Sequence, residues 1–170
     1  FVTHECYYKL KHANKSSTFL KNKNKKEKCR IWRIGMEKRK NNYLKTYMGN
    51  RVDPLDVKAE DITLEDIAHA LSLMCRGNGQ VVHFYSVGQH CINCAKEAKA
   101  RGWNERLQLG CLLHDAAEAY MSDLITPIKV HMPQYYDIED LFLKAVYEKF
   151  SLSDLTKEEW DQIMEVIGPC

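Results

Sequence analysis

Residues 111–129 read CLLHDAAEAYMSDLITPIK. The apolar run that opens this stretch is typical of a buried helix, yet titratable side chains follow it at once. They are His114, Asp115, Glu118 and Asp123. Burying such a side chain without a partner costs several kcal/mol. The four groups therefore either form a solvated patch or face something that compensates them.

Helical patterns continue on both sides of this stretch. Residues that favour the N-cap position precede segments in which apolar residues recur every three or four positions. These caps are Thr63, Ser86, Asn104 and Thr156. We expect the quoted stretch to begin within a helix over 105–121, and a later helix to cover 134–149 after a proline-bounded loop. No alternation typical of strands is found, so the sequence predicts an all-α, single-domain helical bundle over residues 46–170.

Charge is divided unevenly along the chain. The formal net charge is +2, but residues 1–45 hold 14 Lys/Arg against 3 Asp/Glu, while the remainder holds 11 against 20. The first segment is rich in Lys and Asn and poor in periodic apolar residues, a composition that favours a disordered basic arm. Such an arm leaves open a nucleic-acid-binding protein, although charge alone is weak support. Met36 gives a second hypothesis, that residues 1–35 are upstream sequence rather than part of the natural protein.

Compartment can be inferred from apolar runs and cysteines. No window approaches a membrane-spanning length of apolar residues, and no secretory signal is recognised, so we expect a cytoplasmic protein without a membrane partner. Three of the seven cysteines lie in apolar helical patterns and are predicted to be buried thiols. Cys91 and Cys94 have the spacing of a metal-binding pair, but no second pair accompanies them. Two buried side chains on a packed helix are the favoured interpretation.

The titratable residues of the quoted stretch are arranged to meet a histidine from another helix. His114 and Glu118 are four residues apart, so they share one helix face, and Asp115 borders it. His90 belongs to the preceding helix, and antiparallel packing would bring its imidazole close to them. Two imidazoles and a carboxylate suit a divalent metal ion, which would also compensate the buried charge. The pattern predicts a metal site at His90, His114 and Asp115, with Glu118 and Asp123 nearby.

The segments HFYSVGQH (83–90) and LLHDAAEAYMSDLITPIK (112–129) resemble the HD-domain metal-dependent phosphohydrolases. They look closest to the branch that contains the bacterial 5′-deoxynucleotidases. The resemblance covers roughly residues 46–150 and rests on a His, a later His-Asp pair, a Glu three residues on, and the run Asp-Leu-x-x-Pro-x-Lys. It implies an all-helical fold and a metal ion held by the single His and the His-Asp pair.

The resemblance also implies roles for the neighbouring residues. Glu118 and Asp123 would serve the hydrolytic water and the substrate, and Arg76 would grip the substrate phosphate. The implied activity is removal of phosphate from a (deoxy)nucleoside 5′-monophosphate, or a similar small nucleotide, by metal-activated water. Candidate metals are Mn, Co, Mg, Ni and Fe, and a homodimer is the assembly that family members suggest.

Two positions depart from the family pattern. Gly77 follows Arg76 where the family usually has an aromatic residue, and Ile167 stands about where a late helix would supply a fourth ligand, an Asp. Other candidates for that ligand are Asp161, Asp140 and a residue beyond Cys170. The alternative function is therefore a catalytically weak or inactive nucleotide-binding or regulatory module that lacks its fourth metal ligand.

Overall fold

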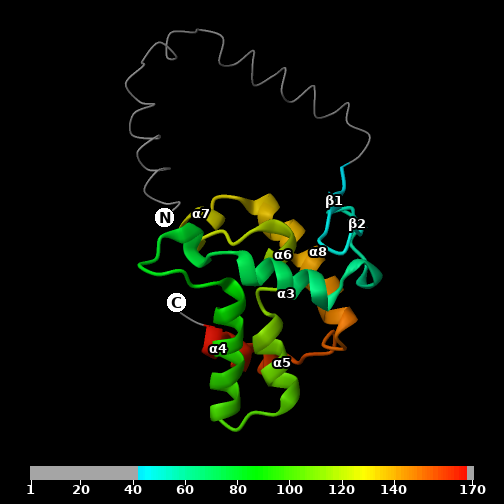
Figure 1. Ribbon diagram of the computed structural model, residues 1–170. Coiled ribbons are helices and arrows are strands. Elements are labelled where there is room, and N and C mark those ends of the chain that lie inside the picture. The colour runs from blue at the N-terminus through cyan, green and yellow to red at the C-terminus, as the bar shows by residue number, and fades with distance from the viewer. Residues whose placement is uncertain (1–41, 168–170) are drawn as a thin grey trace. The chain divides into compact units, whose positions relative to one another are not determined.

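The structure is a computed structural model that describes residues 42–167 (Figure 1). Most of the basic arm predicted over 1–45, the hypothesis about residues 1–35 and the chain end near Cys170 lie outside the described residues. Residues from Asn42 onward belong to one compact unit. Its described part is mostly helical, as the all-α prediction requires. In the part of the chain that the structure describes, no helix is long and apolar enough to cross a membrane.

Helices of varied length follow a small hairpin. In chain order the elements are β1 (Leu44–Lys45), β2 (Arg51–Val52), the 3₁₀ helix η1 (Ala59–Asp61), α3 (Leu64–Leu73), the 3₁₀ helix η2 (Arg76–Gly79), α4 (Val87–Ala100), α5 (Glu105–Leu113), α6 (Glu118–Met121), α7 (Thr126–Lys129), α8 (Pro133–Lys149) and α9 (Lys157–Ile167). β1 and β2 pair antiparallel, with Leu44 opposite Val52. The sequence pattern does not reveal this hairpin, because two-residue strands are too short to show alternation. The folded unit therefore starts slightly before the expected residue 46.

Side-chain caps begin the helices where the sequence predicts them. The oxygens of Thr63, Ser86 and Asn104 accept hydrogen bonds from backbone N–H groups three residues further on, at 3.1, 3.0 and 2.9 Å. Thr156 and Glu159 form a reciprocal capping box, each side chain accepting from the other's backbone N–H. Each cap satisfies an N–H group that the helix itself cannot, and typically contributes about 1 kcal/mol. The capping side chains thus determine where these helices begin.

The helix predicted over 105–121 is interrupted at the His-Asp pair. α5 ends at Leu113, and the N–H groups of Ala116 and Glu118 donate to carbonyls three residues back instead of four. Such tight turns rotate the chain more per residue than an α-helix does. The four-residue spacing of His114 and Glu118 therefore no longer places these two side chains one above the other. The expected loop after this segment also contains a helical turn, α7, whose Pro127 lies in the first turn, where proline is tolerated.

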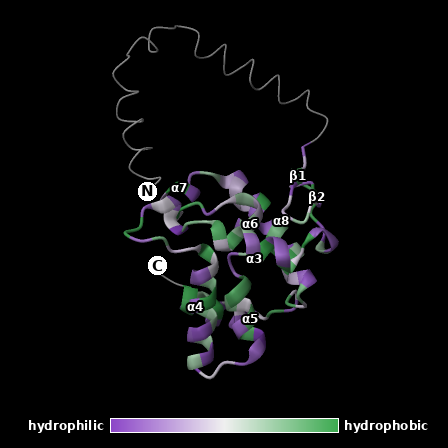
Figure 2. Ribbon diagram, viewed as in Figure 1, coloured by the Kyte–Doolittle hydropathy of each residue, from purple (hydrophilic) through white to green (hydrophobic). Residues whose placement is uncertain are grey.

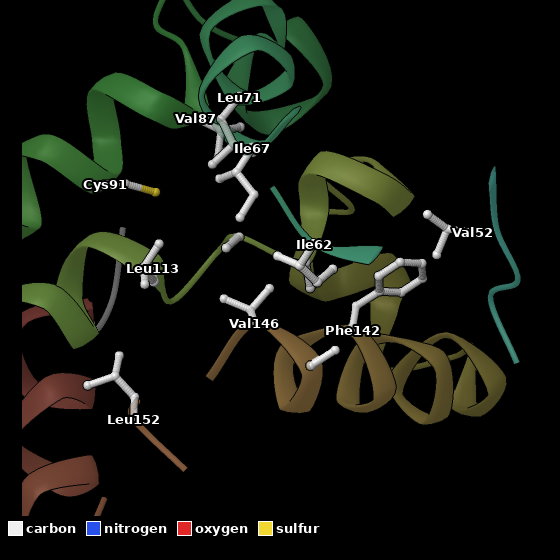
Figure 3. Packing of buried hydrophobic residues seen from close by; sticks show 13 residues of the cluster. Val52, Ile62, Ile67, Leu71, Val87, Cys91, Leu113, Phe142, Val146 and Leu152 are labelled. Atoms are coloured by element: carbon white, nitrogen blue, oxygen red, sulfur yellow. The ribbon is translucent and has the colours of Figure 1, made fainter. Parts of the chain in front are cut away.

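The core forms where apolar faces of several helices meet. α4 and α5 lie side by side in Figure 1 and contact each other, and α9 packs on both. Individual helices carry both hydrophilic and hydrophobic residues, as α3 and α4 show in Figure 2. Phe142 and Val146 project from α8 toward Ile62 (Figure 3), within the larger buried cluster. A smaller cluster contains Ile163 of α9 with residues of α4 and α5, namely Cys94, Ala98, Leu107 and Cys111. This second cluster attaches α9 to the helix pair.

Replacing Ile163 should show how firmly α9 is attached. Ile163 is 0% exposed, so we expect Ile163→Ala to lower the free energy of unfolding by about 2–5 kcal/mol through lost burial and a cavity. Gln162→Ala, an exposed neighbour on the same helix, should change it by less than about 0.5 kcal/mol. Urea unfolding followed by circular dichroism measures both. Equal stabilities of the two variants would show that α9 contributes little to the fold.

Candidate functional site

The structure brings the three predicted metal ligands together at the contact between α4 and the end of α5. His90 lies on α4, and His114 directly follows α5. Their Nε2 atoms are 3.1 Å apart. Asp115 Oδ2 lies 3.0 Å from His114 Nε2 and 3.6 Å from His90 Nε2. Both imidazole side chains are only 4% exposed, so these nitrogen and oxygen atoms are largely screened from bulk water.

Both imidazoles direct a ring nitrogen at the same point. His114 Nδ1 lies 2.8 Å from the carbonyl oxygen of Cys111. A carbonyl can only accept, so Nδ1–H donates, and Nε2 is the ring nitrogen that faces His90 and Asp115. Burial, together with the positive charge of Arg76, lowers the pKa of His90 to about 4. His90 is therefore neutral near pH 7, which is the form that binds metal ions.

Asp115 supplies a charged oxygen to the same point. Burial opposes its ionisation, but His114 and Arg76 outweigh burial and lower its pKa. Arg76 Nη1 donates to Asp115 Oδ2 at 3.0 Å. The result is an ionised carboxylate whose Oδ2 atom contacts a guanidinium and two imidazoles.

These donors fit a metal ion by spacing and by type. Donor atoms of a tetrahedral zinc site stand about 3.3 Å apart for two nitrogens, given bond lengths near 2.05 Å. The three separations of 3.0, 3.1 and 3.6 Å bracket that value. Among the described residues, two groups have ligand atoms within 4.8 Å of one another and could hold a metal ion: His90, Cys94 and His114, and Cys91, His114 and Asp115.

A cavity of about 490 Å³ opens beside these donors. Its polar lining residues include Arg76, Asp115, Glu118, Asp123 and Lys129. Its apolar lining residues include Leu124, Ile125, Pro127, Met164 and Ile167. The lining therefore offers contacts both to a charged group and to a flat or apolar one.

Glu118 is the least compensated group in this cavity. It is 5% exposed, and its Oε2 atom has no hydrogen-bond partner. Burial, reinforced by the charges of Asp115 and Asp123, raises the pKa of Glu118 to about 9. An orphaned buried carboxyl destabilises a fold, so its presence here indicates a use other than stability.

Asp123 holds the turn that carries Arg76. Its Oδ2 atom accepts a hydrogen bond of 2.7 Å from the N–H of Gly77. Gly77 has φ +63°, in the left-handed region that favours glycine. Glycine at position 77, where an aromatic residue was expected, thus fits the left-handed backbone at this turn. The carboxylate predicted to serve the water or the substrate also orients the predicted phosphate-binding arginine.

The proposed substitutes for a fourth ligand lie elsewhere. Asp161 is exposed on α9, and Asp140 of α8 lines a different cavity. Neither belongs to the groups of donor atoms found among the described residues. α9 instead lines the candidate site with Met164 and Ile167. Within residues 42–167, no aspartate of α8 or α9 joins His90, His114 and Asp115.

Lys129 also lines the cavity. Its side chain is 17% exposed and pairs with Glu139 of α8. Its ammonium also lies 5.2 and 5.3 Å from the ring centroids of Tyr135 and Tyr136. The partners that bury it come from α8, and sequence spacing alone could not identify them.

Comparisons with known proteins find bacterial relatives. No protein-family profile matches the sequence. An uncharacterized protein of Rhodobacter capsulatus is 41% identical over 110 residues, which cover 61% of this chain and 56% of the relative. The uncharacterized protein YfdR of Escherichia coli K12 is 34% identical over 110 residues, covering 65% of this chain and 59% of the relative. The matched region thus spans somewhat more than half of each relative.

The raised pKa of Glu118 predicts a pH-dependent stability in metal-free protein. The folded state keeps this proton up to about pH 9, whereas an unfolded Glu releases it near 4.3. The free energy of unfolding should therefore fall as pH rises between these values, and Glu118→Gln should remove that part of the fall. With a chelator present, the variant should match the parent near pH 4 and exceed its stability near pH 8. Urea unfolding across this range tests the difference.

Glu158→Gln, at an exposed position of α9, is the matched control and should leave the pH profile unchanged. Superimposable profiles for Glu118→Gln and the parent would mean that Glu118 ionises normally in the folded protein.

Proposed function

We propose that this chain is a metal-dependent phosphohydrolase of the HD-domain type, which removes phosphate from a nucleoside 5′-monophosphate or a similar small nucleotide. One arrangement carries the proposal: Asp115 Oδ2 lies 3.0 Å from both His114 Nε2 and Arg76 Nη1. A donor of the candidate metal site thereby contacts the cation best suited to a phosphate. The mostly helical fold supports the family assignment.

The residues divide into metal-binding and phosphate-binding groups. His90, His114 and Asp115 would hold the ion, and a bound divalent cation lowers the pKa of water and offsets phosphoryl charge. Arg76 has five N–H donors, so several remain for phosphate oxygens besides the one that contacts Asp115. Lys129, which lines the same cavity, adds a second positive charge. A dianionic phosphate would therefore be bound between cations from two segments of the chain.

The carboxylates have separate tasks in this proposal. Glu118 presents an unsatisfied buried oxygen, which can orient a water molecule for attack on phosphorus. A cation bound nearby would favour the ionised form of Glu118, which can also accept the proton of that water. Asp123 holds Gly77 and so keeps Arg76 directed at the phosphate. Removal of Asp123 would consequently disturb substrate binding before it disturbs proton transfer.

Cavity size and lining support a nucleotide. A volume of about 490 Å³ lies within the usual range of small-ligand sites, about 300–1,000 Å³. The apolar lining residues suit the face of a base or sugar, while Arg76 and Lys129 suit the phosphate. Two imidazole donors favour manganese, iron, cobalt or nickel over magnesium, which prefers oxygen ligands.

Loss of a metal ligand should abolish metal binding and phosphate release together. The purified full chain is loaded with each candidate metal and screened against nucleoside 5′-monophosphates for inorganic phosphate. We expect His114→Ala and Asp115→Asn to lose bound metal and to lower activity by roughly 100-fold or more. Asp161→Ala, at an exposed position outside the site, is the control. Full activity in the metal-free ligand variants would refute the proposal.

Arg76 should be irreplaceable by lysine. Arg76→Lys keeps the charge but loses the forked contact with phosphate, so kcat/KM should fall about 10- to 100-fold, as for loss of a charged hydrogen bond. Arg101→Lys, which changes a surface ion pair with Glu97, should leave kcat/KM unchanged. Steady-state kinetics on the best substrate measures kcat/KM for both variants. Equal effects of Arg76→Lys and Arg101→Lys would show that Arg76 does not bind the phosphate.

A second candidate, a nucleotide-binding or regulatory module without turnover, has one observation in its favour. α9 lines the cavity with Met164 and Ile167 and supplies no carboxylate there. Binding of metal and nucleotide by calorimetry, without phosphate release at any metal, would favour this module over the enzyme.

A further inference from the structure

We propose that the Cys94 thiolate is a fourth donor of the metal site, which would make the site His₂-Asp-Cys and favour zinc or cobalt. The inference deepens the proposed function, because it rests on the metal site formed by His90, His114 and Asp115. It assigns to α4 the donor that an aspartate from a late helix was expected to supply.

Position along α4 gives the first argument. Cys94 follows His90 by four residues, so both side chains lie on the same face of one helix. Its Sγ atom is 3.6 Å from His90 Nε2, the same nitrogen that lies 3.1 Å from His114 Nε2. The ligand atoms of these three residues all lie within 4.8 Å of one another.

The measured spacing suits a mixed nitrogen and sulfur site. With a metal–sulfur bond near 2.3 Å and a metal–nitrogen bond near 2.05 Å, tetrahedral geometry separates sulfur from nitrogen by about 3.6 Å. The Cys94–His90 distance equals that separation. The same sulfur also lies 3.9 Å from His90 Nδ1, so it stands beside the ring. A rotation of the Cys94 or His90 side chain would direct both donors at one ion.

Burial gives the second argument. Cys94 is 6% exposed and packs in the cluster that contains Ile163. Burial keeps water from competing for the sulfur. Sulfur is a soft donor, which zinc and cobalt accept readily and magnesium does not. On coordination the thiol proton would leave to solvent, and the metal–sulfur bond would replace the S–H bond.

Cys91 is the competing thiol, and the structure distinguishes it. Cys91 belongs to the larger core cluster and to the donor group with His114 and Asp115. Cys94, by contrast, contacts a ring nitrogen directly. The two cysteines can therefore be separated by matched serine variants.

Cobalt absorption tests the assignment without reference to activity. The full chain is titrated with Co²⁺ in metal-free buffer with a non-thiol reductant. The parent should show intense tetrahedral visible bands and a near-ultraviolet thiolate-to-cobalt charge-transfer band. Cys94→Ser should lose the charge-transfer band and bind cobalt and zinc at least about tenfold more weakly, since even groups that only support metal ligands contribute that much. Cys91→Ser and Cys111→Ser should keep both.

Several results would overturn the assignment. A charge-transfer band that survives in Cys94→Ser, or one that is lost only in Cys91→Ser, removes Cys94 from the site. Stoichiometric cobalt without any charge-transfer band in the parent does the same and leaves the proposed function standing. A parent that binds no cobalt rejects both the inference and the metal site beneath it. Cys94→Ala repeats the test if the serine variant does not fold, as judged by circular dichroism.

Discussion

Packing of α4 against α5 sets the distance of 3.1 Å between the two imidazole nitrogens, and the rest of the site is built around that separation. Two imidazole nitrogens and a carboxylate oxygen crowd together within 3.0 to 3.6 Å of one another. Such an arrangement is unfavourable by itself and becomes favourable when a cation compensates it. Glu118 adds a further buried carboxyl without a hydrogen-bond partner. The helices therefore hold together a set of groups that would otherwise separate.

Close helix contact depends on a small residue as well as on the apolar core. A side chain at Gly88, near the start of α4, would meet the backbone of Leu71 at about 3.3 Å. Glycine here lets α4 approach α3, and His90 follows only two residues later. The position of the first imidazole is thus coupled to α3 packing, and not only to α5.

Helix starts and donor identities could be predicted because their signals are local. Capping side chains act three residues away, and the His-Asp pair is recognisable within one short run. What could not be predicted depends on contacts between distant segments or on small changes of helical rotation. The turn after Leu113, the Asp123–Gly77 hydrogen bond and the Lys129–Glu139 pair are of this kind. Antiparallel packing of two helices correctly predicted His90 as a neighbour of His114. The shared face of His114 and Glu118 was predicted from a regular helix, but that helix ends at Leu113.

Neighbouring residues of α9 pack in the core and line the cavity. Ile163 is buried against α4 and α5, whereas Met164 and Ile167 line the cavity. A molecule that fills the cavity against these two side chains holds the same helix whose docking completes the smaller cluster. Ligand occupancy and global melting temperature are therefore linked, by an amount that grows with the logarithm of ligand concentration above its dissociation constant. A thermal-shift screen can in this way detect molecules that bind the cavity even when they undergo no chemical change.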